Sequence, residues 1–232
     1  MSFITFGEIM LRLTPEKHRT KINSCNSFNV DYAGSESNVA SSLGVLGDDV
    51  AFVTKLPKNQ LGDAAIRSLS SYSINTNNII RGGNRIGTYF IEQGTSIRPS
   101  KVIYDRKNSS LSEIKENEFD WEKILKGRKW IFLSGITPVL STQCAKETIK
   151  AAEIAQKMGV KVAFDMNYRR SLWKQASDAQ KIFDKILDNT DLLFGNANVL
   201  EDVYDITSEG NNKQEQTINV MKIAREKFKV DK

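Results

Sequence analysis

Residues 129–167, "KWIFLSGITPVLSTQCAKETIKAAEIAQKMGVKVAFDMN", contain two short apolar runs separated by a helical pattern. The runs at 129–136 and 161–167 are rich in Val, Ile and Phe, which favours β-strands. Between them, small apolar residues recur at helical spacing after a capping Ser141 and before Gly159. A strand, a crossover helix and another strand predict part of a parallel sheet that is buried on both faces.

The same alternation extends along the chain in both directions. Strand-like runs occur at "FITFGEI" (3–9), "VAFVTKL" (50–56) and "DLLFGN" (191–196). A last helical pattern places Thr217 and Phe228 on one face. The sequence therefore predicts an α/β fold, with a doubly wound, mostly parallel sheet and helices on both faces.

One part of the chain lacks a helical period. Residues 77–106 form extended, alternating segments interrupted by Gly and Pro, and residues 10–33 are equally irregular. We expect these two segments to form a small β lid. The α/β core would then consist of residues 1–9, 34–76 and 107–232, and would be incomplete at its C-terminal end.

Composition excludes several classes of protein. The 232 residues are 40% hydrophobic, and the net charge of +5 comes from basic and acidic residues mixed along the chain, which is not typical of nucleic-acid binding. Cys25 and Cys144 lie too far apart for a zinc motif, and His18 is the single histidine, so neither a zinc site nor a His-based metal site is expected. With neither a signal peptide nor a long apolar stretch, we expect a soluble, cytoplasmic protein without membrane partners.

A polar cluster in "DYAGSESNVASSLGVLG" (31–47) precedes an expected helix that starts around Ser37 or Asn38. Ligands of open α/β sheets bind outside the carboxyl ends of the strands, where Gly34, Ser35 and Asn38 would lie. Gly34 would allow close backbone approach, and Asn38 can hydrogen-bond to hydroxyls. Alternatively, Ser35 or Ser37 only caps the helix, and the small residues allow close packing. The stretch alone favours neither interpretation.

Two further polar groups follow strand-like segments. In "FDMNYRR", Asp165, Asn167 and Arg169 alternate at the end of an apolar strand, where buried polar groups need partners. In "VIYDR", Tyr104 and Arg106 share one face of an extended segment. Each arginine alone is typical of a surface salt bridge. Together the two arginines, the tyrosine and the asparagine favour a polyhydroxylated anion as ligand, because arginine pairs well with carboxylate and phosphate.

Several motifs in order, from residue 3 to about residue 206, carry a resemblance to a known family. They are "TFGEIMLRLTP", "AGSESNVASSLGVLG", "FVTKLPKNQLGDAA", "GGNRIGTYFIEQG", "KVIYDR", "FLSGITP" and "DMNYRRSLW". The chain resembles the ribokinase-like (PfkB) carbohydrate kinases, and within them it is most similar to the bacterial 2-keto-3-deoxygluconate kinases. Fructokinases share the DxNxR motif and a Tyr or Arg in the lid.

The resemblance implies transfer of the γ-phosphoryl of ATP to a terminal hydroxyl of 2-keto-3-deoxygluconate, with Mg²⁺ neutralising phosphate charge. A lid would exclude water, and it would also form a homodimer. The resemblance implies that the substrate-binding residues are Gly34, Ser35, Asn38, Tyr89, Tyr104, Arg106, Asn167 and Arg169. Arg169 would also support phosphoryl transfer.

The sequence departs from the family pattern in two places. The family's Gly-Ala-Gly-Asp segment, which supplies the catalytic base, does not occur before Lys232, so we expect the catalytic Asp to be outside these residues. The family's NxxE motif, which contacts Mg²⁺ and phosphate, would start at Asn196, but Val199 occupies its fourth position. Asn198 and Glu201 fit the motif two residues later. Asn196 and Glu201 are therefore the candidate nucleotide-binding residues.

Two alternatives to a keto-deoxy-sugar-acid kinase remain open. One is a fructokinase or ribokinase type, which an arginine on a substrate carboxylate would distinguish. The other is a truncated fragment that binds sugar without catalysis.

Overall fold

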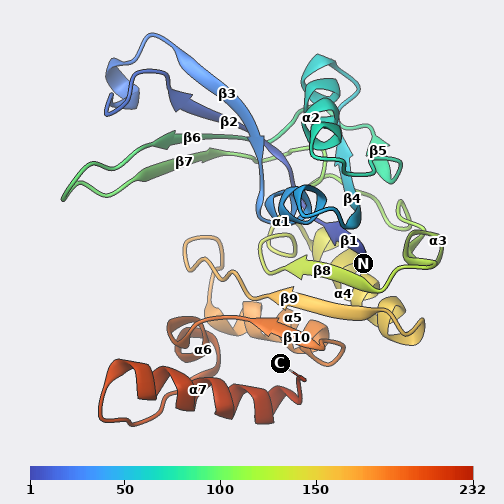
Figure 1. The fold of residues 1–232 in the computed structure, drawn as a ribbon, viewed down its shortest axis with the longest axis vertical. Helices are drawn as coiled ribbons and strands as arrows, with labels where there is room; N and C mark the ends of the chain where they lie inside the picture. The colour runs from blue at the N-terminus through green and yellow to red at the C-terminus, as the bar shows by residue number, and fades with distance from the viewer. Residues whose placement is uncertain (232) are drawn as a thin grey trace. The chain divides into compact units, whose positions relative to one another are not determined.

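The computed structural model describes residues 1–231 (Figure 1). These residues form two compact units. Unit 1 contains Met1–Phe6 and the chain from Lys115 onward, and unit 2 contains Gly7–Ile114. Among residues 1–231, no helix is long and apolar enough to cross a membrane.

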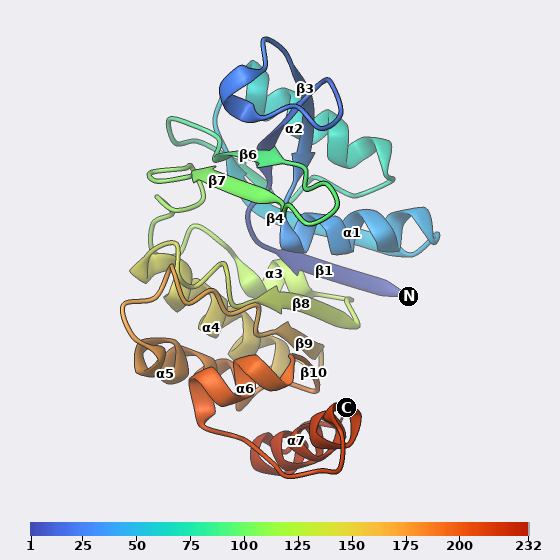
Figure 2. The ribbon, with the colours of Figure 1, turned by 90° about the vertical axis from the view of Figure 1, so that its left-hand side faces the viewer.

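Unit 1 is built on parallel strands in the order β10-β9-β8-β1. The strands are β1 (Ser2–Phe6), β8 (Trp130–Ser134), β9 (Lys161–Asp165) and β10 (Leu192–Phe194). Its helices are α3 (Trp121–Leu125), α4 (Thr142–Lys157), α5 (Ala176–Leu187), α6 (Ala197–Tyr204) and α7 (Lys213–Phe228). Helices α6 and α7 lie next to each other (Figure 2).

The β8–α4–β9 segment forms the predicted crossover. Ser141 caps α4, because its side chain accepts a hydrogen bond from the Cys144 N–H at 3.1 Å. The helix ends before Gly159, whose φ of 71° belongs to the left-handed region that glycine adopts without strain. The buried face of α4 is mostly small, including Ala151 and Ala155, so the helix packs closely against the sheet.

Aromatic side chains form part of the core of unit 1. The Phe6 ring makes edge-to-face contacts with Phe119 and Trp121, with centroids 5.3 and 5.0 Å apart. The Trp121 indole Nε1–H donates to Glu147 Oε2 at 2.7 Å, and both side chains are buried. This bond joins α3 to α4.

Unit 2 contains a parallel pair of strands and a separate mixed sheet, which we call the small sheet. The parallel pair is β4 (Asp49–Leu56) and β5 (Ile79–Arg81), accompanied by α1 (Ser35–Val45) and α2 (Gln60–Ser71). The small sheet has the order β3-β2-β6-β7 and consists of β2 (Met10–Pro15), β3 (Phe28–Ala33), β6 (Thr88–Glu92) and β7 (Lys101–Asp105). The short helix η1 (Ile22–Ser24) connects β2 to β3.

The strands of the small sheet lie within the predicted lid segments. Strands β2 and β3 pair antiparallel, β6 and β7 pair antiparallel, and β2 pairs with β6 in parallel. Residues Ile79–Arg81 were expected in the lid as well, but they pair with β4. The register places Asp31, Arg12, Tyr89 and Tyr104 opposite one another across the strands, and therefore on one face.

Two predicted boundaries are wrong by a few residues. The strand expected over 3–9 ends at Phe6. Helix α1 begins at Ser35, two to three residues before its predicted start, with Gly34 at the N-cap position. Capping by Ser37 is also wrong, because Gly34 holds the N-cap position and the Ser37 hydroxyl donates to the Gly34 carbonyl at 3.1 Å.

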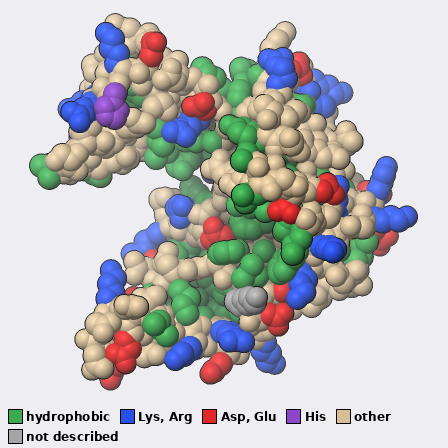
Figure 3. Space-filling view, in the orientation of Figure 1, with side chains coloured by type: hydrophobic (Ala, Val, Ile, Leu, Met, Phe, Trp, Pro, Cys, Tyr) green, Lys and Arg blue, Asp and Glu red, His purple; other side chains and the backbone are tan. Residues whose placement is uncertain are grey.

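The fold class itself is confirmed. The structure is α/β, with mostly parallel strands flanked by helices, together with a small additional sheet. Basic and acidic side chains are interspersed on the face shown in Figure 3, in agreement with their mixture along the sequence.

Candidate functional site

The side chain of Arg106, just after β7, forms an ion pair with a buried carboxylate of unit 2. Its Nε–H donates to Glu8 Oε2 at 2.8 Å, and its Nη2 group also contacts this oxygen. The Glu8 side chain is 3% exposed and the Arg106 side chain 11%. The Ser109 hydroxyl donates to the other carboxylate oxygen of Glu8. The guanidinium is therefore fixed in orientation.

Aromatic rings extend this cluster along the small sheet. The guanidinium carbon of Arg106 lies 5.6 Å from the centre of the Tyr104 ring, within the range of a cation–π contact. The Tyr104 and Tyr89 rings are 5.8 Å apart on paired strands. Burial raises the pKa of the Tyr89 hydroxyl, so it remains a neutral donor and acceptor at ordinary pH. Oriented cationic donors beside phenol rings can bind a ligand with both hydroxyl and anionic groups.

Gly34 belongs to the same cluster, because the backbone of Glu8 passes directly against it. A Cβ atom added at Gly34 would lie 1.9 Å from the Glu8 carbonyl oxygen. One added at Gly87 would lie 2.8 Å from Glu8 Oε1. Any side chain at Gly34 would therefore displace the loop that carries Glu8.

The first turns of α1 carry the other predicted residues of unit 2. Asn38 is exposed, and its backbone N–H donates to the Gly34 carbonyl at 2.9 Å. Its side-chain amide makes no hydrogen bond to another of residues 1–231. Ser35 is partly buried at the start of the helix. The structure thus brings Gly34, Arg106 and the two tyrosines into one network, with Asn38 on the adjoining helix.

A second cluster lies in unit 1, at the carboxyl ends of β9 and β10. Here a cavity of about 400 Å³ is lined by polar and apolar residues of both strands and of the start of α6. The polar residues are Asp165, Asn167, Arg169 and Asn196. The alternating residues of "FDMNYRR" therefore do face a common cavity, together with Asn196.

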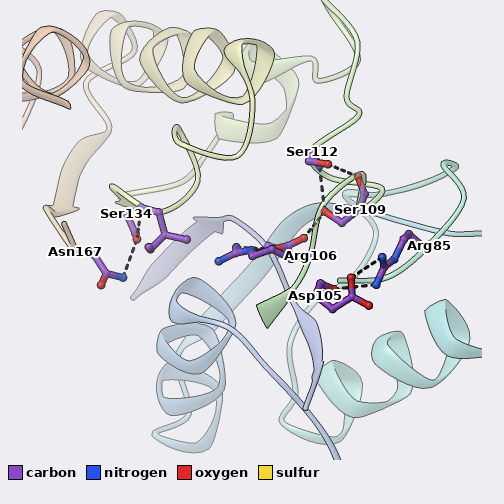
Figure 4. A network of polar contacts seen from close by, with 9 residues as sticks. Arg85, Asp105, Arg106, Ser109, Ser112, Ser134 and Asn167 are labelled. Atoms are coloured by element: carbon purple, nitrogen blue, oxygen red, sulfur yellow. Dashed lines mark hydrogen bonds and ion pairs between the residues drawn. The ribbon is translucent and has the colours of Figure 1, made fainter. Parts of the chain in front are cut away.

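Asn167 has a conformation that its neighbours stabilise. Its φ of 36° is left-handed, a region that asparagine tolerates better than most residues. Its N–H donates to Asp165 Oδ1 at 2.9 Å and its amide Nδ2 to Ser134 Oγ at 3.2 Å (Figure 4). Burial raises the pKa of Asp165, opposed by the Asn167 N–H and by the charge of Arg169. The Arg169 guanidinium donates to the Tyr168 carbonyl at 3.1 Å.

Asn196 and Glu201, expected to bind nucleotide, are not brought together. Asn196 caps α6, with its Oδ1 accepting from the Val199 N–H at 3.0 Å. Glu201 is exposed and lines a different hollow, which it shares with Asn198. The residues described contain no cluster of three or more His, Cys, Asp or Glu side chains suited to a metal ion.

Sequence reasoning did not assign Glu8 or Ser134 to the site. Glu8 had one signal: it is an acidic residue directly after an apolar strand, at the end where ligands bind. Its partners Arg106 and Ser109 lie about a hundred residues away in the sequence, so no local pattern links them. Ser134 is the last residue of β8 and reaches the site only because β8 pairs with β9.

Comparison with known proteins identifies the class to which this fold and these clusters belong. The family model described as "pfkB family carbohydrate kinase" matches residues 2–230, and the chain belongs to this family. A 2-dehydro-3-deoxygalactonokinase of Haloferax volcanii is 34% identical over 190 residues, which are 82% of this chain and 59% of that protein. A 5-dehydro-2-deoxygluconokinase of Clostridium beijerinckii is 24% identical over 94% of this chain and 64% of that protein.

Among solved structures, the 2-dehydro-3-deoxygluconokinase of Thermotoga maritima is similar to this chain with a TM-score of 0.94 and 44% sequence identity. The match covers 99% of this chain and 70% of that protein. The chain thus spans 59% and 64% of the two curated relatives that it matches.

Proposed function

We propose that the chain is part of an ATP-dependent sugar kinase that phosphorylates a terminal hydroxyl of a 2-keto-3-deoxy sugar acid. The observation that carries this proposal is the oriented Arg106 guanidinium beside Tyr104 and Tyr89 in a pfkB-family chain. The relatives named for the gluconate and galactonate compounds support the keto-deoxy acid class. We propose 2-keto-3-deoxygluconate as substrate, with its C4 epimer as the nearest alternative.

Each candidate substrate-binding residue of unit 2 has a role in this proposal. Arg106 donates to the carboxylate of the sugar acid, because guanidinium N–H groups match carboxylate geometry. Tyr104 and Tyr89 pack against the carbon chain and hydrogen-bond to its hydroxyls. Backbone groups at Gly34 and the exposed amide of Asn38, with Ser35 beside them, bind the remaining hydroxyls.

The residues of unit 1 are proposed to act on the phosphoryl group. Asn167 and Arg169 line the cavity at the strand ends, where an arginine stabilises negative charge on a transferring phosphoryl group. The Asn196 amide would donate to a nucleotide phosphate, since its oxygen is engaged in capping and its nitrogen is not.

Within residues 1–231, one carboxylate is a candidate ligand for Mg²⁺. This carboxylate is the side chain of Glu201. Mg²⁺ commonly takes only one or two carboxylates, together with phosphates and water, so one exposed Glu is compatible with it. When bound, the ion would neutralise phosphate charge. The general base is assigned to none of the described residues.

The test is calorimetric titration of the chain with 2-keto-3-deoxygluconate, its C4 epimer and fructose, alongside an assay of ATP-dependent sugar phosphorylation. Binding of a sugar acid in preference to fructose supports the proposal, and turnover assigns the chemistry to these residues. Binding without turnover indicates a sugar-binding fragment. Preference for fructose indicates a fructokinase type and removes the carboxylate role of Arg106.

The proposal includes a homodimer formed through the small sheet, in the cytoplasm. The face opposite the tyrosines carries a registered apolar row of Val30, Leu13, Phe90 and Ile103. Val30 and Ile103 are 57% and 53% exposed. Sedimentation of the wild type and of Ile103→Lys tests the dimer. A wild-type monomer, or an unchanged dimer in the variant, contradicts this interface.

A further inference from the structure

Glu8 is a buried carboxylate whose two oxygens are both occupied by side chains of unit 2. We propose that Glu8 is the positioning residue of the sugar-acid site, which orients Arg106 so that its remaining N–H groups face the ligand carboxylate. This inference rests on the proposed function and adds to it a residue that acts through Arg106 and does not touch substrate.

The contacts leave a defined part of the guanidinium for a ligand. Glu8 Oε2 faces the Nε and Nη2 atoms of Arg106, and Nη1 has no hydrogen-bond partner among residues 1–231. The Nη2 atom is buried and lacks a hydrogen bond of good geometry within residues 1–231. Because Nη2 is buried against Glu8, a ligand carboxylate would accept from the N–H groups of Nη1.

Glu8 is itself held rigidly. The Ser109 hydroxyl donates to Oε1, and Ser109 in turn accepts from the Ser112 hydroxyl through its backbone carbonyl at 2.8 Å. Gly87 lies so close to Oε1 that no side chain fits there. The carboxylate therefore has little freedom to rotate, and neither has the guanidinium bound to it. Such preorganisation lowers the entropy that is lost when a ligand binds.

The ion pair also sets how the site recognises an anion. Because Glu8 compensates the charge of Arg106, the pair offers the ligand oriented N–H donors with little net charge. Two hypotheses about the site predict opposite changes in affinity when the charge of the Glu8 carboxylate is removed. If net charge governs affinity, Glu8→Gln binds a sugar acid more tightly; if orientation governs it, the variant binds more weakly.

The experiment is titration of the wild type and Glu8→Gln with 2-keto-3-deoxygluconate and with fructose. The matched control is Asp105→Asn, which removes the same charge from an exposed pair with Arg85 (Figure 4). We expect Glu8→Gln to bind the acid about tenfold more weakly, a change of about 1.4 kcal/mol, and Asp105→Asn to stay within about twofold. Equal or tighter binding by Glu8→Gln overturns the inference.

A spectroscopic readout separates positioning from a structural role. The Nε–H of Arg106, assigned in ¹⁵N-arginine spectra with Arg106→Lys, should exchange slowly in the wild type and at least tenfold faster in Glu8→Gln. An unchanged exchange rate overturns the inference even if affinity falls. If Glu8→Gln does not fold, Ser109→Ala keeps the ion pair and should bind the acid several-fold more weakly; unchanged affinity there also counts against positioning.

Failure of the two proposals can be told apart. A wild-type chain that does not prefer the sugar acid to fructose overturns the proposed function. Wild-type preference for the acid, combined with unchanged affinity in Glu8→Gln, overturns the role of Glu8 alone.

Discussion

Replacing Arg106 by Met should reveal the energetic coupling of the buried ion pair. The Glu8 side chain is 3% exposed in the wild type, and the substitution leaves it the Ser109 hydroxyl as its remaining side-chain partner. Removing one member of a buried pair typically costs about 3–5 kcal/mol of unfolding free energy, because the other charge stays buried without compensation. We expect a loss in this range for Arg106→Met.

Adding Glu8→Gln to Arg106→Met should recover most of that loss. A neutral amide beside a methionine leaves no unpaired charge, and replacing both members of a buried pair is often close to neutral. The sum of the unfolding free energies lost in the two single variants should therefore exceed the loss in the double variant by at least about 2 kcal/mol.

The assay is urea unfolding of the wild type, the two single variants and the double variant, followed by far-ultraviolet circular dichroism. The unfolding free energies are compared with one common slope for their dependence on urea concentration. The pair Asp105→Asn and Arg85→Met serves as the exposed control, for which we expect a coupling below about 1 kcal/mol. Additive single effects for Glu8 and Arg106 would refute the reasoning, because they would mean that the carboxylate does not depend on the guanidinium.

Three further substitutions test other parts of the structure. Gly34→Ala should cost about 1–3 kcal/mol in urea unfolding, because its Cβ would overlap the Glu8 carbonyl oxygen; a neutral effect would contradict this close approach. Trp121→Phe removes the donor to the buried Glu147 carboxylate and should cost about 1.5–3 kcal/mol by the same measurement, with a loss under about 0.5 kcal/mol counting against the bond. Burial raises the pKa of Asp165, so the folded state binds its proton more tightly, and the resulting stabilisation is lost as pH rises through the folded pKa. Asp165→Asn keeps the acceptor for the Asn167 N–H, so we expect its melting temperature to exceed that of the wild type at about pH 7 and to match it near about pH 3.5; the reverse order would contradict the shift.

The elements that were predicted well are those with local determinants. The cap at Ser141, the small-residue face of α4 and the stop at Gly159 all lie within one short stretch, and the structure reproduces them. The start of α1 was misplaced because Gly34 holds the N-cap position without a side-chain cap, so the capping signal pointed to the serines after it.

The parts of the site that could not be predicted depend on contacts distant in sequence. Glu8 and Arg106 are 98 positions apart, and nothing near either residue indicates the other. The sequence pattern does not decide whether the NxxE motif starts at Asn196 or at Asn198, because Asn196 also has the sequence signature of a helix cap. In the structure Asn196 caps α6. The assignment of Gly34, Tyr89, Tyr104 and Arg106 to substrate remains a prediction.

The parallel pairing of β2 with β6 has a consequence for the order of folding. The two antiparallel pairs of the small sheet, β2–β3 and β6–β7, each join neighbouring segments, whereas the contact of Leu11 with Thr88 closes a loop of 88 − 11 = 77 positions. Long loops close at a larger entropic cost, so each hairpin should form before the parallel β2–β6 pairing, which we call the seam between them. The seam is then the place where the sheet separates first under mild denaturant, as two intact hairpins.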